Sequence, residues 1–269
     1  MHYLRKKERS GILANEYYQM GWTLGEQYEE EYYYTREENK YFIKKNATPI
    51  IATLSAEKIV PKLKWTRRLS NGDVIIAQDF QNGRNLSSKE MIDKRIPKIL
   101  KKVHNSIKLK KMMINQGFKK ETSKSSLDNL KKILSKELLE NRDISLAIEY
   151  LERNRPKDDI LAPCHADLHK DNWLLSDSNK LFLVDWEQAI LGDPAIDISF
   201  VLYLYIPQEN WDIWLKEYGI VPTLSYKLKL KWYMLFQSLV MVVWYNKKQQ
   251  FSKMNKWLVF IDKIFTKYI

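Results

Sequence analysis

The segment at residues 162–175, APCHADLHKDNWLL, concentrates two histidines, two aspartates and an asparagine between small and apolar neighbours. It runs directly into WLLSDSNKLFLVDW, in which two apolar runs flank the turn-prone residues DSNK. Apolar runs on both sides of a short turn-forming stretch are typical of a β-hairpin. The sequence therefore predicts a hairpin over residues 173–186, with a polar loop immediately before it.

The register of this hairpin determines which side chains meet. If residues 177–180 form the loop, continuing the count places Asn172 opposite Asp185. Opposed side chains start about 5 Å apart, and carboxylate and amide oxygens suit a hard cation such as Mg²⁺. Asp167 lies five residues before Asn172 and can bring a third oxygen group to the same point. Phosphoryl transfer requires such metal ligands and a carboxylate that accepts a hydroxyl proton.

Two other interpretations of these residues stay open. His165 and His169 are four residues apart, so on a helix they would share a face and could ligate zinc. The remaining ligands would come from Cys164, an aspartate, or one of the other histidines, His2 and His104. Alternatively, the hairpin is a hydrogen-bonded structural element without chemistry.

The chain changes character along its length. Its first 80 residues carry short aromatic and β-branched runs (EEYYYT, KYFIKK, DVIIAQDF) separated by turn signals, which predict a small sheet. Within them NATPIIATLSAEKIV has a helical pattern, with Thr48 as the cap and Pro49 at the first helical position. Helical patterns dominate after QNGRNLSS. We expect an α+β chain with a strand-rich lobe at residues 1–82 and a helical lobe at residues 83–269.

The composition favours a soluble protein of a reducing compartment. Even the apolar stretch MLFQSLVMVVW is interrupted by Gln237 and Ser238, and a membrane span needs roughly 18 apolar residues. The start, MHYLRKKERSG, lacks the apolar region of a signal peptide. The single cysteine excludes an internal disulfide. We expect a cytoplasmic protein without membrane insertion.

The formal net charge of +12 has two interpretations. It can mark a partner such as nucleic acid or an acidic membrane, or it can reflect a lysine-rich solvated surface. The densest part, KILKKVHNSIKLKK, has most of its lysines between apolar positions at helical spacing, as in an ordinary amphipathic helix. We favour the solvated helix, with a nucleic-acid partner as the alternative.

HADLHKDN and LVDWEQAILGDPAIDIS together carry a pattern more specific than either half, His-x-Asp-x-x-x-x-Asn followed by an aspartate at a strand end. With it, the chain resembles the aminoglycoside phosphotransferase and choline kinase superfamily, a relative of the protein kinases. The resemblance extends through KYFIKKN, WTRRLSNGDVIIAQDFQNGR and the helical C-terminal region. It looks closest to a small bacterial phosphotransferase branch that contains the cell-cycle regulator CcrZ. It implies a bilobal protein-kinase-like fold and an enzyme that uses ATP and Mg²⁺ to phosphorylate a hydroxyl group of a small molecule.

The resemblance also implies roles for individual residues. It makes Asp167 the catalytic base, and Asn172 and Asp185 the ligands of Mg²⁺. Lys44, at the end of YFIK, would hold the nucleotide phosphates, and Glu57 would pair with it from the following helix.

Further family positions are expected to bind adenine or to support the loop. The backbone around Gln78 and Asp79 would be the hinge that meets adenine. His165 would fix the loop, Asp193 would cap a helix, and Asp197 would accept backbone hydrogen bonds from the catalytic loop.

One part of the kinase pattern is missing before Lys44. A glycine-rich phosphate loop is expected there, yet MGWTLGEQYEEEYYY offers only Gly21 and Gly25. We therefore expect nucleotide binding that is weak or that is completed by the substrate or a partner.

The acceptor has to be inferred from the C-terminal region. Between Pro207 and Ile269 ten lysines stand against four acidic residues, which disfavours a polycationic aminoglycoside. Aromatic and polar side chains at helical spacing could stack a base or sugar or hold a quaternary ammonium group, or they could simply form helix core. They are Trp211, Trp214, Trp232, Tyr233 and Gln237, and Glu187 is added because it lies two residues beyond Asp185.

These observations rank the acceptors and the functions. We expect a nucleoside or ribose-type acceptor first and choline or ethanolamine second. The resemblance adds a cell-cycle role with partners in the cell-division machinery. The alternative is a non-catalytic kinase-like protein that binds a regulatory partner.

Overall fold

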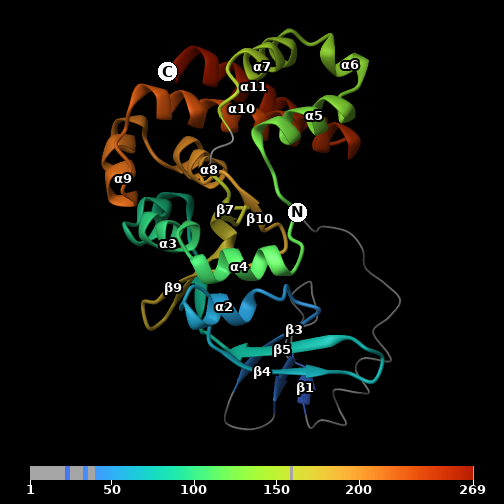
Figure 1. Ribbon diagram of the computed structural model, residues 1–269, viewed down its shortest axis with the longest axis vertical. Helices are drawn as coiled ribbons and strands as arrows, with labels where there is room; N and C mark the ends of the chain where they lie inside the picture. Colours follow the sequence, from blue (N-terminus) through green and yellow to red (C-terminus); the bar gives the residue numbers. More distant parts are fainter. Residues whose placement is uncertain (1–21, 25–32, 36–39, 158–159, 269) are drawn as a thin grey trace. The chain divides into compact units, whose positions relative to one another are not determined.

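The computed structural model describes residues 22–24, 33–35, 40–157 and 160–268 (Figure 1). The chain divides into two compact units. Met1–Arg84 and Leu175–Phe182 form the first unit, and Asn85–Leu174 with Leu183–Ile269 form the second. The α+β class predicted from the sequence is confirmed, because antiparallel strands dominate the first unit and helices dominate the second.

Antiparallel strands form the core of the first unit. The main sheet has the order β3-β5-β4, and the short strands β1 and β2 pair with each other. The strands are β1 (Trp22–Leu24), β2 (Tyr33–Thr35), β3 (Tyr41–Lys45), β4 (Leu63–Arg68) and β5 (Val74–Asp79). Ile43, Ile75 and Ala77 are fully buried on one side of this sheet together with Leu69. The β-branched residues of KYFIKK and DVIIAQDF therefore form strands because they bury this apolar face.

Helix α2 (Ile51–Ala56) is shorter than its sequence pattern predicts. Ile51 N–H donates to Thr48 C=O (3.2 Å) in a turn, so Ile50 is the N-cap and the predicted cap at Thr48 is wrong. Glu57 is the C-cap rather than a residue within the helix, because Lys58 follows with a φ of 58°.

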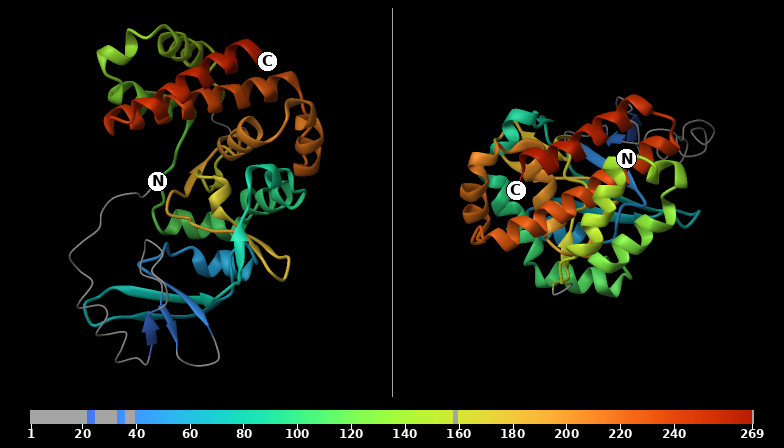
Figure 2. Two further views of the ribbon diagram at one scale, coloured as in Figure 1. Left: turned by 180° about the vertical axis from the view of Figure 1, so that it is seen from behind. Right: turned by 90° about the horizontal axis from the view of Figure 1, so that it is seen from above.

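The second unit consists mainly of helices packed around α10. This helix packs against α7, α8 and α11, and Figure 2 shows α10 and α11 lying side by side. The helices are α3 (Arg95–His104), α4 (Ile107–Asn115), α5 (Ser123–Ile133), α6 (Lys136–Leu139), α7 (Arg142–Arg153), α8 (Ala195–Tyr205), α9 (Trp211–Tyr218), α10 (Leu224–Lys247) and α11 (Phe251–Lys267), with the 3₁₀ turns η1 (Ser88–Ile92), η2 (Lys170–Asn172) and η3 (Gln208–Asn210).

Local sequence sets where several of these helices begin. Ser106, Thr122, Asn141 and Thr223 each accept a backbone N–H of the first helical turn through their side-chain oxygen. Such caps satisfy donors that have no partner inside the helix. None of the helices in the described part of the chain combines the length and hydropathy of a membrane span.

Two small sheets carry the polar loop between them. β7 (Ala162–Cys164) pairs antiparallel with β10 (Ile190–Gly192). β6 (Gly83–Asn85), β8 (Trp173–Ser176) and β9 (Leu181–Leu183) form a sheet in the order β6-β8-β9. The predicted hairpin therefore exists as β8–β9.

The hairpin loop is one residue shorter than predicted. Ser176 N–H donates to Lys180 C=O (2.8 Å), which closes a loop of residues 177–179. Asn179 ends this loop with a φ of 60°. A type I turn followed by a left-handed residue is a common three-residue hairpin loop, and asparagine adopts that conformation at low cost.

The shorter loop changes the register. Val184 N–H donates to Asn172 C=O (2.9 Å), so Asn172 lies opposite Val184. The predicted opposition of Asn172 and Asp185 is wrong by one residue. Asp185 instead follows the end of β9 with a φ of 64°, outside regular strand geometry.

Candidate active site

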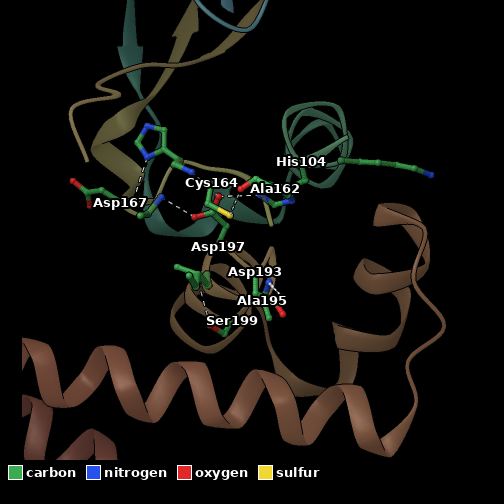
Figure 3. A network of polar contacts seen from close by, with 12 residues as sticks. His104, Ala162, Cys164, Asp167, Asp193, Ala195, Asp197 and Ser199 are labelled. Atoms are coloured by element: carbon green, nitrogen blue, oxygen red, sulfur yellow. Dashed lines mark hydrogen bonds and ion pairs between the residues drawn. The ribbon is translucent and has the colours of Figure 1, made fainter. Parts of the chain in front are cut away.

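Asp197 holds the loop between β7 and η2. It lies on the first turn of α8 and is 1% exposed. Its Oδ2 accepts from His165 N–H (2.8 Å) and its Oδ1 from Ala166 N–H (2.8 Å). Figure 3 shows Asp197 between Cys164 and Asp193 in this network of polar contacts. Ala166 has a φ of 61°, a conformation that costs a residue with a side chain on the order of 1 kcal/mol. The two charge-assisted hydrogen bonds offset that cost and fix the loop.

His104 completes the environment of Asp197. Its Nε2 lies 2.9 Å from Asp197 Oδ2, and its Nδ1 lies 2.8 Å from the hydroxyl of Tyr218. Burial disfavours the charged carboxylate, but the hydrogen bond and charge of His104 and the backbone N–H of His165 outweigh it, so the pKa of Asp197 lies below its ordinary value. Asp197 therefore acts as an anion in the interior.

His165 links the loop to the strand that precedes Asp185. Its Nδ1 accepts from Asp167 N–H (3.3 Å), so its Nε2 carries the proton and donates to Val184 C=O (2.9 Å). The ring is fully buried and makes an edge contact with Trp186 at 4.7 Å between centroids. His165 thus fixes the backbone on both sides and has no ring nitrogen left for a metal.

Asn172 closes the loop from its other end. Its Nδ2 donates to Asp167 C=O (2.8 Å), which leaves Oδ1 as the side-chain atom that can ligate a cation. Val184 is bonded through N–H to Asn172 and through C=O to His165. Asp185 is the next residue, and it is exposed. The hydrogen bonds of Val184 therefore tie the chain at Asp185 to the loop that carries Asp167 and Asn172. These hard oxygen ligands fit Mg²⁺.

Asp193 supports this arrangement. Asp193 Oδ1 accepts from Ala195 N–H (2.9 Å) at the start of α8, and its Oδ2 forms an ion pair with Lys229. Asp193 thereby fixes the helix that carries Asp197. Glu187 is exposed beyond Asp185, where a carboxylate can be reached by solvent.

The zinc interpretation does not fit the loop. His165 and His169 do not lie on a common helix, because the chain from β7 to η2 is irregular. His169 is exposed and contacts the edge of Phe200 at 5.0 Å between centroids.

Within the described residues, His104, Cys164 and Asp197 lie close enough to share an ion. His104 and Asp197 are hydrogen-bonded to each other, and Cys164 is fully buried. Burial raises the pKa of the Cys164 thiol well above its usual range, with Asp197 and Asp193 adding to it, so the thiol stays neutral. This cluster is therefore a polar core rather than a metal site.

The aromatic set predicted to bind the acceptor is buried, which corrects that expectation. Trp232 and Tyr233 are 0% and 1% exposed, and Trp232 Nε1 donates to Leu151 C=O (2.8 Å). Trp211 Nε1 donates to Ile206 C=O (3.0 Å), and its ring stacks on Tyr268.

The other two predicted members are also used inside the protein. Trp214 is buried and stacks on Tyr218, and Gln237 Nε2 bonds to Ile196 C=O (3.1 Å) and Ser199 Oγ (3.0 Å). Apolar faces at helical spacing form helix core here, as such faces usually do.

The residues predicted to meet the nucleotide lie in the first unit. Lys44 lies on β3 opposite Ile76, and Glu57 caps α2. Gln78 is buried and its Nε2 donates to Pro61 C=O (2.7 Å), while Asp79 forms an ion pair with Lys64 (3.0 Å). Gly21 and Gly25 lie outside the described residues, so the departure from a glycine-rich loop stays a prediction.

Sequence reasoning missed two residues near the loop. His104 was considered only as a zinc ligand, although it sits on the apolar face of α3 with Leu100 and Val103, where a histidine needs buried partners. The hydroxyl of Tyr205 accepts from Lys170 N–H (3.2 Å) and ties the end of α8 to the loop. No local pattern marks Tyr205, because α8 is apolar on all sides.

A comparison with protein families shows the family of this chain. The Phosphotransferase enzyme family matches residues 50–229, more than half of the chain. The chain belongs to this family, and the prediction of the aminoglycoside phosphotransferase and choline kinase superfamily is confirmed at that level.

Among curated proteins, protein LicA of Haemophilus influenzae is 43% identical over 63 residues, which are 23% of this chain and 18% of that protein. Protein LicA of the Rd strain is 41% identical over 63 residues, 23% of both chains. The match therefore spans about a fifth of the length of these relatives.

Solved structures share the fold over most of the chain. Choline kinase LicA from Streptococcus pneumoniae has a TM-score of 0.66 at 14% identity, covering 94% of this chain and 98% of that chain. Spectinomycin phosphotransferase APH(9)-Ia, in complex with ADP and spectinomycin, has a TM-score of 0.64 at 17% identity over 90% and 92%. A thermostable mutant of aminoglycoside phosphotransferase APH(4)-Ia, in a ternary complex with AMP-PNP and hygromycin B, has a TM-score of 0.67 at 14% identity over 95% and 98%. These likenesses confirm the predicted kinase-like fold.

Proposed function

We propose that this chain is an ATP- and Mg²⁺-dependent kinase that phosphorylates a hydroxyl group of a small molecule. The observation that carries the proposal is the loop of residues 165–172. His165 accepts from the N–H of Asp167 and Asn172 donates to its C=O, while Asp197 accepts from the N–H groups of the two residues before it. A loop fixed by buried polar groups, with carboxylates left towards solvent, is the arrangement that phosphoryl transfer requires.

In this proposal each polar group has one task. Asp167 orients the acceptor hydroxyl and takes its proton on a carboxylate oxygen. Asn172 Oδ1 and the Asp185 carboxylate hold Mg²⁺, which when bound neutralises the phosphate charge. In the first unit, Lys44 binds the nucleotide phosphates, Glu57 orients Lys44, and the backbone at residues 78–79 meets adenine.

The structure bears on the acceptor as well. The expectation of a nucleoside rested on Trp211 and Trp232, which are buried, so it has lost its main support. Two other rings by the loop are accessible: His169 is exposed and Tyr205 is partly exposed, and both lie beside the buried Phe200, with centroids 5.0 Å and 6.5 Å from its ring.

Acidic groups accompany these rings. Burial raises the pKa of Tyr205, and the charges of Asp171 and Asp167 raise it further, so both carboxylates act on this hydroxyl. Aromatic rings beside carboxylates favour a small cation. We therefore propose an amino alcohol such as choline or ethanolamine as the first acceptor to test, in line with the structural likeness to choline kinase LicA. Nucleosides and ribose-type sugars are the second.

The resemblance to the CcrZ branch adds a separate proposal, a cell-cycle role through protein partners. The catalytic proposal does not depend on it.

The test is a phosphoryl-transfer assay with Mg²⁺-ATP and a panel of choline, ethanolamine, nucleosides, ribose and aminoglycosides, with products identified by mass spectrometry. We expect a phosphorylated amino alcohol, no product with EDTA, and product formation lowered by about 10² or more with Asp167→Asn. Product from a nucleoside alone would overturn the acceptor proposal and keep the kinase. ATP binding without any product would favour the non-catalytic partner-binding alternative.

A further inference from the structure

The segment that contains α3 and α4 is strongly basic. Residues 94–120 include nine lysines and one arginine and no acidic residue. The only arginine, Arg95, is paired with Asp93 (2.6 Å) just before the segment. All nine lysines are exposed. This positive charge is independent of the catalytic loop and is not used by the proposed function.

The two faces of α4 differ sharply. Leu109 and Met113 are fully buried. Helix α4 packs on β7 and β10, beside which Figure 1 shows it. Ile107 and Ile114 point the other way and are 69% and 46% exposed. Because they are seven residues apart, they lie on one line along the outer face of the helix.

Lysines surround the two isoleucines. Lys111 lies between them along the helix, and Lys108 and Lys110 lie on either side, from the helical rotation of about 100° per residue. In the part of the chain that the structure describes, no carboxylate is paired with these three lysines. We call Ile107, Lys108, Lys110, Lys111 and Ile114 the α4 surface. Its apolar line between unpaired cations has no partner within the described chain.

The positive charge of the α4 surface favours an anionic partner. Its two exposed isoleucines indicate which kind of anionic partner fits. Single-stranded nucleic acid is bound through aromatic platforms, and the α4 surface contains no phenylalanine, tyrosine or tryptophan. Recognition of phosphate by paired hydrogen bonds relies on arginine, which the α4 surface lacks. A lipid surface uses both features, because the apolar side chains enter the interface while the lysines attract anionic headgroups.

We propose that the α4 surface docks on an anionic membrane, with the lysines of α3 adding long-range attraction. This is peripheral binding, in which α4 lies along the lipid surface while Leu109 and Met113 stay packed on the protein. The proposal does not depend on the phosphotransferase activity.

The test is co-sedimentation of the full chain with phosphatidylcholine vesicles with and without phosphatidylglycerol, at low and high salt. We expect binding only to the anionic vesicles, weakened by salt. Lys110→Glu/Lys111→Glu should lower the partition coefficient roughly tenfold or more, since each surface lysine contributes to attraction by an anionic leaflet. Ile107→Ser/Ile114→Ser should lower it about fivefold, because apolar burial in the interface is lost.

The matched control is Lys256→Glu/Lys267→Glu on α11, which makes the same change in net charge at two exposed lysines. We expect it to weaken binding about twofold at most, through net charge alone. Equal losses for both lysine pairs would mean non-specific attraction and would overturn the proposal. It would also be overturned if the isoleucine pair had no effect, or if a short RNA bound more tightly than vesicles through the same lysines. Circular dichroism of each variant shows whether it is folded.

Discussion

The loop of residues 165–172 and the aromatic positions of α9 and α10 both suggest a function from the sequence, and the structure distinguishes the two regions. In the loop, buried Asp197, His165 and His104 use their polar atoms on backbone and on one another, which leaves Asp167 half-buried and Asp185 exposed. In α9 and α10 the indoles of Trp211 and Trp232 are themselves buried, and their N–H groups donate to backbone carbonyls.

The two regions differ because the free energy of burial differs between tryptophan and aspartate. A tryptophan gains free energy on burial, so helical spacing of tryptophans is satisfied by an ordinary core. A buried carboxylate is costly unless it is fully bonded, so Asp197 implies a set of donors that it organises. Polar residues in apolar surroundings therefore indicate a site more reliably than aromatic residues do.

The largest effect is expected where a core indole is removed. Trp232→Ala should lower the free energy of unfolding by about 3–5 kcal/mol, because it leaves a cavity and an unpaired Leu151 carbonyl. Denaturant unfolding measures it. The milder Trp232→Phe should keep the acceptor KM unchanged, and Trp244→Ala, at a partly exposed position, should cost much less. A raised acceptor KM in a fully stable Trp232→Phe would contradict the assignment of Trp232 to the core.

The second effect concerns chemistry alone. Asp167→Asn should lower kcat by about 10² or more while the melting temperature stays unchanged, because it removes a base and little volume. Asp171→Asn is the matched control, since it makes the same change at an exposed carboxylate four residues away. It should raise the acceptor KM at most. Similar kcat losses in both variants would show that general charge, and not the position of Asp167, determines the rate.

The third effect links stability to the loop. Asp197→Asn should lower the free energy of unfolding by about 2 kcal/mol, because an amide nitrogen must then face a backbone N–H. Since the folded pKa of Asp197 lies below the ordinary 3.8, the carboxylate stabilises the fold above about pH 4 and this stabilisation is lost as pH falls through the folded pKa.

The measurement is chemical unfolding of both proteins from pH 7 to pH 3. The stability difference between wild type and Asp197→Asn should be full at pH 7 and should narrow in acid. A difference that is constant over this range would argue against an ionised Asp197.

The smallest effect tests Tyr205 as a positioning residue. Tyr205→Phe removes the acceptor of Lys170 N–H and should lower kcat about fivefold, as expected for one hydrogen bond, with the KM for ATP and the melting temperature unchanged. Tyr203→Phe is the control, because the buried Tyr203 hydroxyl has no partner among the described residues. Its kcat should not change. Equal responses of the two variants would assign no role to the Lys170 contact.

Much of the fold follows from the sequence, because strand-like and helix-like patterns separate cleanly along the chain. The same local rules fail where the conformation of one backbone residue determines the length of a loop or the end of a helix. Asn179 with a φ of 60° shortened the hairpin loop and moved Asn172 by one residue, and Lys58 with a φ of 58° ended α2 before Glu57. A shift of one residue at a hairpin loop or a helix end changes the neighbours of every residue that follows.

The candidate site divides in the same way. The loop residues Asp167 and Asn172 can be proposed from residue types and spacing, and the role of Asp197 follows from the resemblance to the phosphotransferase family. His104 and Tyr205 could not, because they reach the loop from α3 and α8 across long sequence separations. Such contacts exist only once the chain has folded.

Cys164, the only cysteine of the chain, sits on β7 directly before the loop and is fully buried with a raised thiol pKa. A thiol in this state reacts with a labelling reagent only when its surroundings open. The rate of labelling therefore measures how often the interior beneath the loop becomes accessible to solvent, without any engineered probe. The labelling rate of Cys164 is thus a built-in measure of local opening at β7, the strand directly before the loop that carries Asp167.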